Sequence, residues 1–368
     1  MFSRFKIYLK NFDWIIFAAV LLLVAFGLLE IYSVALGRGS LNLLNFKKQV
    51  FFAGFGFFLL FFFTFIDSYF LKSLSRYWYF LAVIVLIAVM VFGQTIRGTK
   101  GWFSVFGFSL QPVEFVKIIL ILFLANFFSN LATKVKTTRH FIFSGLSTLV
   151  LVALVLMQPD FGSVLILCFI WFVMILAAGF PKKYFIIIGV SLVIVFTASW
   201  FFFFKDYQKE RILNFVNPGT QSLESGYNIS QAMIAVGSGG LTGKGVGFGS
   251  QSQLKFLPEA QNDFILAVIA EELGFLGVIL VIGFYFIFFF RCFHILSKIN
   301  NDFGIYFLIG ATGLIFIQMF INIGMNLGIV PIVGLSLPFV SYGGSSLLSL
   351  LILVGMVENI IIKSKISY

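Results

Sequence analysis

The stretch WIIFAAVLLLVAFGLLEIYSVAL (residues 14–36) decides the class of fold. It is apolar over a length that can cross the hydrocarbon core of a bilayer as one helix. The preceding segment, MFSRFKIYLKNFDW, is basic, but the apolar run is too long for the core of a cleavable signal peptide. We therefore expect a membrane-spanning helix here and no cleavable signal peptide.

The composition of the whole chain agrees with a membrane protein. Of its 368 residues, 60% are hydrophobic and 11% are charged, whereas a soluble domain carries about a quarter charged residues. Cys168 and Cys292 both lie in or beside apolar runs, so neither a disulfide framework nor a cysteine metal site is expected. Lipid is therefore the main solvent of this chain.

Apolar runs long enough to span a bilayer recur along the sequence. Residues 205–262 form the only long polar segment, which we expect to be one extracytoplasmic loop before the eighth span. No solenoid repeat or low-complexity linker divides the chain, so residues 1–368 are expected to form a single all-α polytopic membrane domain of about ten transmembrane helices. The predicted spans are 14–36, 50–66, 78–93, 112–130, 141–157, 162–181, 184–204, 264–290, 303–326 and 345–362.

The basic residues orient these spans. If the N-terminus is cytoplasmic, the short inside loops and the two tails hold more than half of the 25 Lys and Arg residues, as the positive-inside rule requires. Both termini are therefore expected in the cytoplasm. The same distribution accounts for the net charge of +11 without a nucleic acid partner.

The glycine-rich part of the long loop, GSGGLTGKGVGFGSQSQLKFLPEAQND (residues 237–263), does not encode a nucleotide site. A P-loop lysine is followed by Ser or Thr, whereas Lys244 is followed by Gly245. The glycines instead permit tight turns and close backbone approach.

Two predicted spans begin with Gln-Pro followed by an acid, in QPVEFVK (residues 111–117) and QPDFG (residues 158–162). Proline suits the first helical turn, and an acid there meets the positive end of the helix dipole, so capping alone could explain Asp160. Glu114 differs because Lys117 follows at i+3 on the same face. An ionised pair inside a membrane helix is a functional candidate; a purely structural ion pair is the alternative.

Asp263 stands where the long loop meets the eighth span, in LPEAQNDFILAVIAEELG (residues 257–274). A simple helix N-cap is one interpretation of this position. Glu271 and Glu272 lie about 12 to 13 Å deeper and point in other directions, at roughly 100° of rotation per residue. Neither glutamate can form a carboxylate pair with Asp263, so we expect both to be interior hydrogen-bonding residues.

A hydroxyl-rich break precedes the last span, in LPFVSYGGSSLL (residues 337–348). Irregular backbone at membrane depth is tolerated only against protein or water. We therefore expect this break to line a cavity, although a turn that merely starts the helix is an alternative.

Taken together, these motifs resemble the SEDS family (shape, elongation, division and sporulation), which includes RodA, FtsW and SpoVE. The resemblance covers nearly the whole chain, and GSQSQLKFLPE is more similar to RodA than to FtsW. It implies a peptidoglycan glycosyltransferase that polymerises lipid II at the outer face of the cytoplasmic membrane, with a class B penicillin-binding protein as partner. Its motifs, in order, are QPVEFVK, QPDFG, GSGGLTGKG, FLPEAQNDFILAVIAEELG and LPFVSYGGSS.

The resemblance also implies roles for individual residues. The essential aspartate of the family falls on Asp263. The glutamate and lysine of its QPSE motif fall on Glu114 and Lys117, and the aspartate of its QPDLG motif falls on Asp160.

Three positions depart from the pattern of the family. Val113 stands in place of a serine, and Val333 in place of a frequent threonine. Gly101 replaces an arginine before the tryptophan, so either Lys100 or Arg97 would have to supply that positive charge.

The implied reaction suits a single carboxylate. An acceptor sugar hydroxyl attacks an anomeric carbon that carries a lipid-linked diphosphate, so the hydroxyl needs a general base, for which we expect Asp263. An α-linked donor and a β-linked product imply inversion without an obligatory covalent intermediate, unlike glycosidases with two paired carboxylates. The leaving diphosphate needs positive charge, from lysines, arginine or a divalent cation such as Mg²⁺ or Mn²⁺. The expected substrate-binding residues are Glu114, Lys117, Asp160, Arg97, Lys100, Lys244, Lys255, Ser341, Tyr342, Gly343, Gly344 and Ser345.

Two functions of other classes stay open. A transporter that flips lipid II would also suit the Glu114 and Lys117 pair, but the acidic motifs gather at the outer ends of spans, whereas carrier sites usually lie near the midplane. A non-catalytic scaffold for a cell-wall transpeptidase would leave the loop motifs without a purpose.

Overall fold

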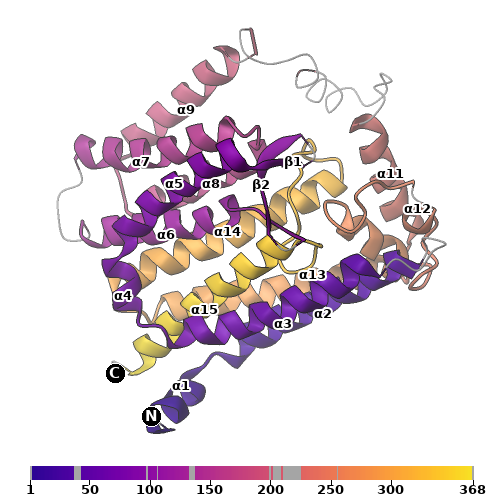
Figure 1. The fold of residues 1–368 in the computed structure, drawn as a ribbon, viewed down its shortest axis with the longest axis horizontal. Coiled ribbons are helices and arrows are strands. Elements are labelled where there is room, and N and C mark those ends of the chain that lie inside the picture. The colour runs from indigo at the N-terminus through magenta and orange to yellow at the C-terminus, as the bar shows by residue number, and fades with distance from the viewer. Residues whose placement is uncertain are drawn as a thin grey trace.

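The computed structural model describes most of the chain as a bundle of long helices that run side by side (Figure 1). Two candidate cations, Arg97 and Lys255, lie outside the described residues, as does most of the first half of the predicted 205–262 loop. The described residues are 2–36, 43–96, 98–105, 107–131, 137–198, 200–201, 209, 225–254 and 256–366. The helices are α1 (Phe2–Asn11), α2 (Trp14–Leu36), α3 (Leu44–Phe65), α4 (Ser68–Ser73), α5 (Ser75–Phe92), α6 (Val113–Ser129), α7 (Thr138–Leu156), α8 (Phe161–Ala177), α9 (Lys182–Ala198), α11 (Ser225–Ser238), α12 (Ser250–Gln253), α13 (Ile265–Leu296), α14 (Asp302–Asn326) and α15 (Gly344–Ile366).

A helix coincides with each apolar run that the sequence predicts to span the membrane. Among the described residues, seven helices are long and apolar enough to cross a bilayer: α2, α3, α5, α7, α13, α14 and α15. Helices α6, α8 and α9 are shorter, with 17 residues each. The predicted class, an all-α multi-pass membrane protein, is confirmed, while the number of ten spans stays a prediction.

Helix α15 forms the centre of the bundle, since 94% of its most apolar 18-residue stretch is buried inside the protein. Its neighbour α3 approaches so closely that a β-carbon at Gly355 would lie 2.3 Å from the carbonyl oxygen of Leu60. One turn further on, Asn359 Nδ2 donates to the carbonyl oxygen of Thr64 at 2.7 Å. A small residue and an interhelical hydrogen bond thus join the two helices, as is usual where lipid removes the hydrophobic drive for association.

The two termini lie at the same end of the bundle, where charged residues join α13 and α15 to the start of α2 (Figure 1). Arg291 Nε donates to both carboxylate oxygens of the buried Asp13, at 3.0 and 2.9 Å, and Lys365 Nζ lies 3.5 Å from the same group. Burial alone would raise the pKa of Asp13, but the hydrogen bonds and charge of Arg291, together with Lys365, hold it below its ordinary value. This basic end is the one that the positive-inside rule assigns to the cytoplasm.

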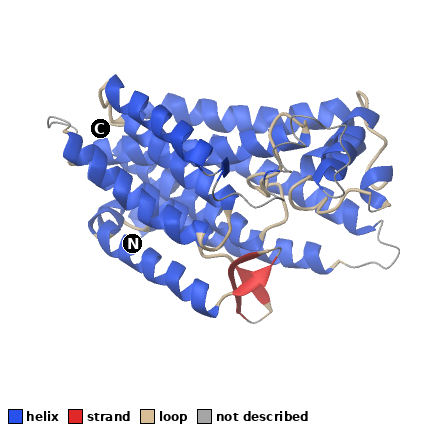
Figure 2. Ribbon diagram, turned by 90° about the horizontal axis from the view of Figure 1, so that it is seen from above, coloured by secondary structure: helices blue, strands red, loops and turns tan. Residues whose placement is uncertain are grey.

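A small sheet departs from the all-helical prediction. Strands β1 (Gln94–Ile96), β2 (Thr99–Val105) and β3 (Phe108–Leu110) pair antiparallel in the order β1-β2-β3, between α5 and α6 (Figure 2). Strands of three to seven residues carry too little apolar alternation to be predicted from sequence.

Helix α13 is broken at Gly274, whose φ of 68° favours glycine. The carbonyl oxygens of Glu271 and Glu272, freed by the break, accept the backbone N–H groups of Lys244 at 3.0 Å and Gly245 at 2.9 Å. The glycine-rich loop after α11 therefore completes the backbone hydrogen bonding of a membrane helix.

Replacing Gly355 by valine should force α3 and α15 apart, because the new side chain would collide with the backbone at Leu60. Overpacking of this kind costs about 1–3 kcal/mol. We expect a lower midpoint of thermal unfolding in detergent. Gly283→Val is the control, because nothing lies within 4 Å of a β-carbon at Gly283. An equal loss in both variants would contradict close packing as the cause.

Candidate active site

Asp263 lies half-buried on the turn that leads into α13. Its backbone carbonyl oxygen accepts from Asn322 Nδ2 at 2.9 Å and from Asn326 Nδ2 at 3.0 Å. Both asparagines are buried on α14, and Asn326 Oδ1 also accepts the backbone N–H of Ala267 at 3.1 Å. Helix α14 therefore holds the start of α13 at Asp263 and again one turn later, at Ala267.

The structure does not use Asp263 as the N-cap of α13. Phe264 occupies that position, and no side chain makes a capping hydrogen bond there. The Asp263 carboxylate faces Gly334, where a β-carbon would lie 3.7 Å from Oδ2. Capping is thus not the reason for an acid at this position.

The irregular segment before α15 lies against the Asp263 turn. Ser341 Oγ donates to the carbonyl oxygen of Asn262 at 2.5 Å and accepts the backbone N–H of Leu337 at 2.8 Å. The backbone N–H of Tyr342 donates to the carbonyl oxygen of Gln261 at 2.8 Å. The hydroxyl-rich break therefore contributes to the site and is more than the start of a helix.

Two amide side chains of α3 hold this arrangement from the side. Gln49 Nε2 donates to the carbonyl oxygen of Ser341, and Gln49 Oε1 accepts the backbone N–H of Gly343, both at 3.2 Å. Asn45 Nδ2 donates to Gln261 Oε1 at 2.8 Å. The next residue after Gly343, Gly344, begins α15.

Ser345 connects this segment to the two Gln-Pro motifs. Its Oγ accepts the backbone N–H of Gln111 at 2.9 Å, and Gln111 Nε2 donates to Asp160 Oδ2 at 3.1 Å. Asp160 also caps α8, because its carboxylate accepts from the backbone N–H and the hydroxyl of Ser163, at 3.0 and 2.8 Å. The capping interpretation of Asp160 is confirmed, and a role in substrate binding stays a prediction.

Residues 333–335 lie between Asp263 and the QPDFG motif. The carbonyl oxygen of Val333 would lie 2.9 Å from a β-carbon at Gly162, while the next residue, Gly334, faces Asp263. The carbonyl oxygen of Leu335 accepts from Asn322 Nδ2 at 2.7 Å. The structure thus brings four sequence motifs of the candidate site together at one end of the bundle: LPEAQND, LPFVSYGGSS, QPVEFVK and QPDFG.

Backbone strain lies in three of these four motifs, QPDFG, LPEAQND and LPFVSYGGSS. Among the described residues, the non-glycine positions with positive φ are Pro159 at 28°, Glu259 at 53° and Phe339 at 64°. Such conformations cost on the order of 1–3 kcal/mol each, and they cluster at functional sites because the surrounding structure must enforce them.

Glu114 and Lys117 form the ion pair that their spacing predicts. Lys117 Nζ lies 2.7 Å from Glu114 Oε1. Lys117 is 1% exposed and Glu114 is 8% exposed, and the ammonium has no other polar partner within the described part of the chain. A closed, buried pair is compatible with both the functional and the structural interpretation.

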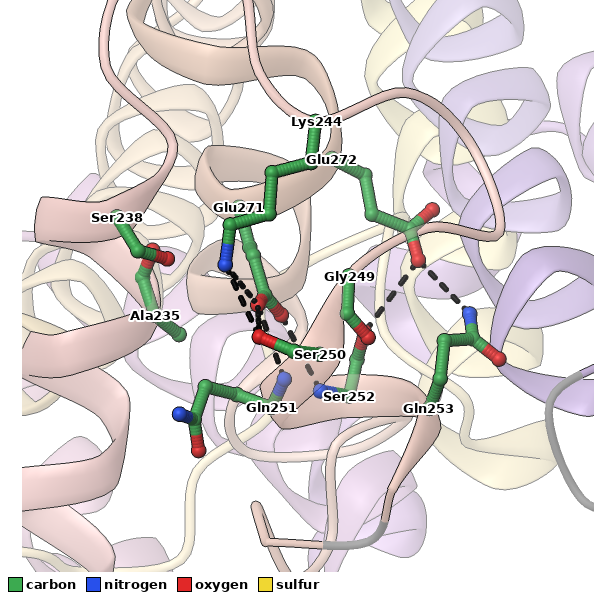
Figure 3. Close-up of polar contacts among 10 residues, drawn as sticks. All are labelled: Ala235, Ser238, Lys244, Gly249, Ser250, Gln251, Ser252, Gln253, Glu271 and Glu272. Carbon is green, nitrogen blue, oxygen red and sulfur yellow. Dashed lines mark hydrogen bonds and ion pairs between the residues drawn. The ribbon is translucent and has the colours of Figure 1, made fainter.

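Lys244 belongs to a different cluster, shown in Figure 3. Its Nζ lies 3.0 Å from Glu271 Oε1 and 3.0 Å from the hydroxyl oxygen of Ser250. Glu271 also accepts the backbone N–H groups of Gln251 at 2.9 Å and Ser252 at 3.2 Å. The charge of Lys244 is therefore neutralised where it helps to hold the loop on α13.

Glu272 supports the same loop from the other side of the helix. Its carboxylate accepts from the backbone N–H of Gly247 at 3.0 Å, from Gln253 Nε2 at 2.9 Å and from the hydroxyl of Ser33. The prediction that Glu271 and Glu272 are interior hydrogen-bonding residues is confirmed.

Lys100 is exposed on β2, opposite Thr95 of β1. A β-carbon at the neighbouring Gly101 would lie 3.3 Å from Gln158 Oε1, so the sheet lies beside the QPDFG motif. Lys100 forms no ion pair with any acid that the structure describes, which leaves its charge available.

Sequence reasoning missed the amides that position Asp263. A signal was present, because Gln318, Asn322 and Asn326 recur every four residues in an otherwise apolar helix. Spacing of i+4 places all three on one helical face, and polar groups in a membrane helix are expected to face protein.

A metal ligand set is not evident in the described part of the chain, where no three His, Cys, Asp or Glu side chains gather in a way that could hold a metal ion. Mg²⁺ is commonly held by one or two carboxylates together with substrate phosphates. A divalent cation therefore stays a prediction.

Asn322→Leu should destabilise the turn, because it removes the donor to the carbonyl oxygens of Asp263 and Leu335. A buried group left unsatisfied costs about 1–3 kcal/mol. We expect a lower unfolding midpoint in detergent and lower activity. Gln318→Leu is the control, since Gln318 Oε1 lies buried on the same helix without a partner. Unchanged stability of Asn322→Leu would contradict the positioning role.

Comparison with protein families identifies relatives over nearly the whole chain. The model of the cell cycle protein family FtsW/RodA/SpoVE matches residues 13–366. The chain is 36% identical to peptidoglycan glycosyltransferase MrdB of Escherichia coli K12, over 78% of this chain and 77% of that protein. It is 32% identical to probable peptidoglycan glycosyltransferase FtsW of Thiomicrospira cyclica, over 98% of this chain and 94% of that protein.

Two solved structures share the fold. One is a chain from a peptidoglycan synthase complex that coordinates polymerization and crosslinking, with a TM-score of 0.81, 29% identity, and coverage of 97% of this chain and 98% of that chain. The other is the rod shape determining protein RodA of Thermus thermophilus, with a TM-score of 0.72, 27% identity, and coverage of 95% and 96%. The chain resembles these proteins in sequence and in architecture, and it belongs to the FtsW/RodA/SpoVE (SEDS) family.

Proposed function

We propose that this peptidoglycan glycosyltransferase polymerises lipid II at the outer face of the cytoplasmic membrane, with Asp263 as general base. The observation that carries the proposal is the meeting of four motifs, LPEAQND, LPFVSYGGSS, QPVEFVK and QPDFG, around the Asp263 turn, at the end of the bundle away from the termini (Figure 1). Lipid II has sugars that require water and a tail that requires lipid. A carboxylate at the outer end of a membrane helix can contact the sugars in water while the tail of the same substrate stays in lipid.

The Asp263 carboxylate takes the proton of the acceptor hydroxyl. As that proton leaves, the hydroxyl oxygen forms the new bond to the anomeric carbon and the bond from this carbon to the diphosphate oxygen breaks. Attack from the face opposite the leaving group inverts the configuration, so one carboxylate suffices. A base must lie within about 2.6–3.2 Å of the group that it deprotonates, which explains the rigid turn that Asn322 and Asn326 hold.

The departing diphosphate is stabilised by positive charge. Lys100 and Lys117 are the described candidates, and Arg97 and Lys255 stay candidates from the sequence. Lys117 and Lys244 already pair with Glu114 and Glu271, so each contributes less positive charge than Lys100, which pairs with no acid that the structure describes. Mg²⁺ or Mn²⁺ held by the substrate phosphates would supply further charge.

We also propose a class B penicillin-binding protein as partner, which would crosslink the strands that this chain polymerises. The relationship to a chain of a peptidoglycan synthase complex supports this pairing. The flippase alternative is less well supported, because the hydrogen-bonded motifs gather at one end of the bundle and carrier sites usually lie near the midplane.

Asp263→Asn should insert, fold and bind lipid II, yet form almost no polymer, because an amide cannot accept the hydroxyl proton. Losses of roughly 10²- to 10⁴-fold are usual when a general base is removed. The assay is glycan strand formation by purified protein from lipid II, at several substrate concentrations. Asp302→Asn, at the exposed start of α14, is the matched control. Wild-type turnover by Asp263→Asn would remove Asp263 from the mechanism.

Variants of the buried pair separate its two interpretations. Glu114→Gln should lower activity strongly while the protein stays folded. Lys117→Met should lower activity more than Lys117→Arg does, because arginine keeps the positive charge. Breaking a purely structural buried pair costs about 3–5 kcal/mol, whereas removing both partners is often neutral. The double variant Glu114→Gln/Lys117→Met should therefore recover thermal stability without recovering activity. Recovery of both would show that the pair is structural.

A further inference from the structure

A groove opens between the end of α6 and the start of α7, and no step of the proposed reaction uses it. Its volume is about 650 Å³, and most of its wall is apolar, formed by Phe127, Ile142, Phe143 and Leu146. Ile142, Phe143 and Leu146 are 57%, 50% and 57% exposed, so the groove is open on the side that faces lipid.

One end of the groove is polar and carries positive charge. Thr138, Arg139 and His140 line it, and none of the described residues that line the groove is acidic. Arg139 is exposed, and its guanidinium pairs with no acid in the described part of the chain. His140 Nδ1 accepts the backbone N–H of Thr137 at 3.3 Å, so the proton of the neutral ring lies on Nε2. The groove therefore offers two donor groups to an anion.

The groove lies at the end of the bundle that holds the termini. Asn126 Nδ2, near the end of α6, donates to Ser75 Oγ at the start of α5, at 2.8 Å. The short helix just before it, α4, is capped by Asp67, whose carboxylate pairs with Lys363 near the C-terminus. The positive-inside rule assigns this basic end to the cytoplasm, where the leaflet is rich in anionic lipids.

The dimensions suit an amphiphile. Seven residues of α7 separate Arg139 from Leu146, which places the apolar wall about 10 Å along the helix from the guanidinium. A headgroup phosphate at the polar end would leave an acyl chain beside Phe143 and Leu146.

We propose that this groove binds one anionic glycerophospholipid of the cytoplasmic leaflet. Its phosphate accepts hydrogen bonds from Arg139 and from His140 Nε2, and one acyl chain lies along the apolar wall. Charge complementarity selects this occupant, because a guanidinium with no acid beside it attracts phosphate, whereas a zwitterionic lipid brings its own positive charge. The proposal is independent of the reaction at Asp263.

Native mass spectrometry of the full-length protein in detergent, titrated with phosphatidylglycerol, tests the site. Arg139→Gln should weaken the first binding event about tenfold, as expected for one lost charge-assisted hydrogen bond. Arg76→Gln is the matched control, because Arg76 is exposed at the same end of the bundle and does not line the groove. Unfolding midpoints confirm that each variant is folded.

A second pair of variants tests the apolar wall. Leu146→Trp should fill the groove and weaken phosphatidylglycerol binding, whereas Leu149→Trp, on the same helix and 58% exposed outside the groove, should not.

Equal affinity of Arg139→Gln and Arg76→Gln for phosphatidylglycerol would overturn the proposal. Equally tight binding of phosphatidylcholine would show that the groove only contacts bulk lipid and does not select an anionic one. Displacement of phosphatidylglycerol by inorganic phosphate would show an anion site without a lipid.

Discussion

The end of the bundle away from the termini depends on two amide hydrogen bonds to one carbonyl oxygen, from Asn322 and Asn326 to Asp263. Backbone groups near hydrocarbon must be satisfied within the protein, and each failure costs several kcal/mol, roughly. Because Asn322 also binds the carbonyl oxygen of Leu335, the Asp263 turn and residues 333–335 are held by the same side chain. A carboxylate on such a turn is positioned before substrate arrives, as the proposed role of Asp263 as a single base would require.

The two ends of the bundle use different chemistry. At the candidate site, neutral amides and hydroxyls such as Gln49, Ser341 and Ser345 hold irregular backbone in place beside the Asp263 turn. At the end with the termini, Arg291 and Lys365 surround Asp13 instead. The neutral groups at the candidate site fix backbone geometry, whereas the ion pairs at the other end join helices that are far apart in sequence.

Much of the fold could be predicted because the bilayer imposes it: each apolar run became a helix. The candidate site was predicted where chemistry is local, as in the Glu114 and Lys117 pair on one helical turn. Contacts between distant segments could not be predicted. The ion pair of Lys244 with Glu271, 27 residues further along the chain, is one such contact, and a role of Lys244 in substrate binding stays a prediction. The short sheet could not be predicted either, because its three strands are too short for their sequences to indicate which strands pair.

An experimental structure of the Asp263→Asn variant with lipid II bound tests the central claim most directly. The substitution keeps the shape of the side chain and should prevent turnover. The account predicts that the attacking sugar hydroxyl lies within about 2.6–3.2 Å of the side chain at position 263, with the diphosphate beside Lys100 or Lys117. A substrate whose diphosphate, and not its sugar hydroxyl, contacts position 263 would contradict the assignment of Asp263 as the base.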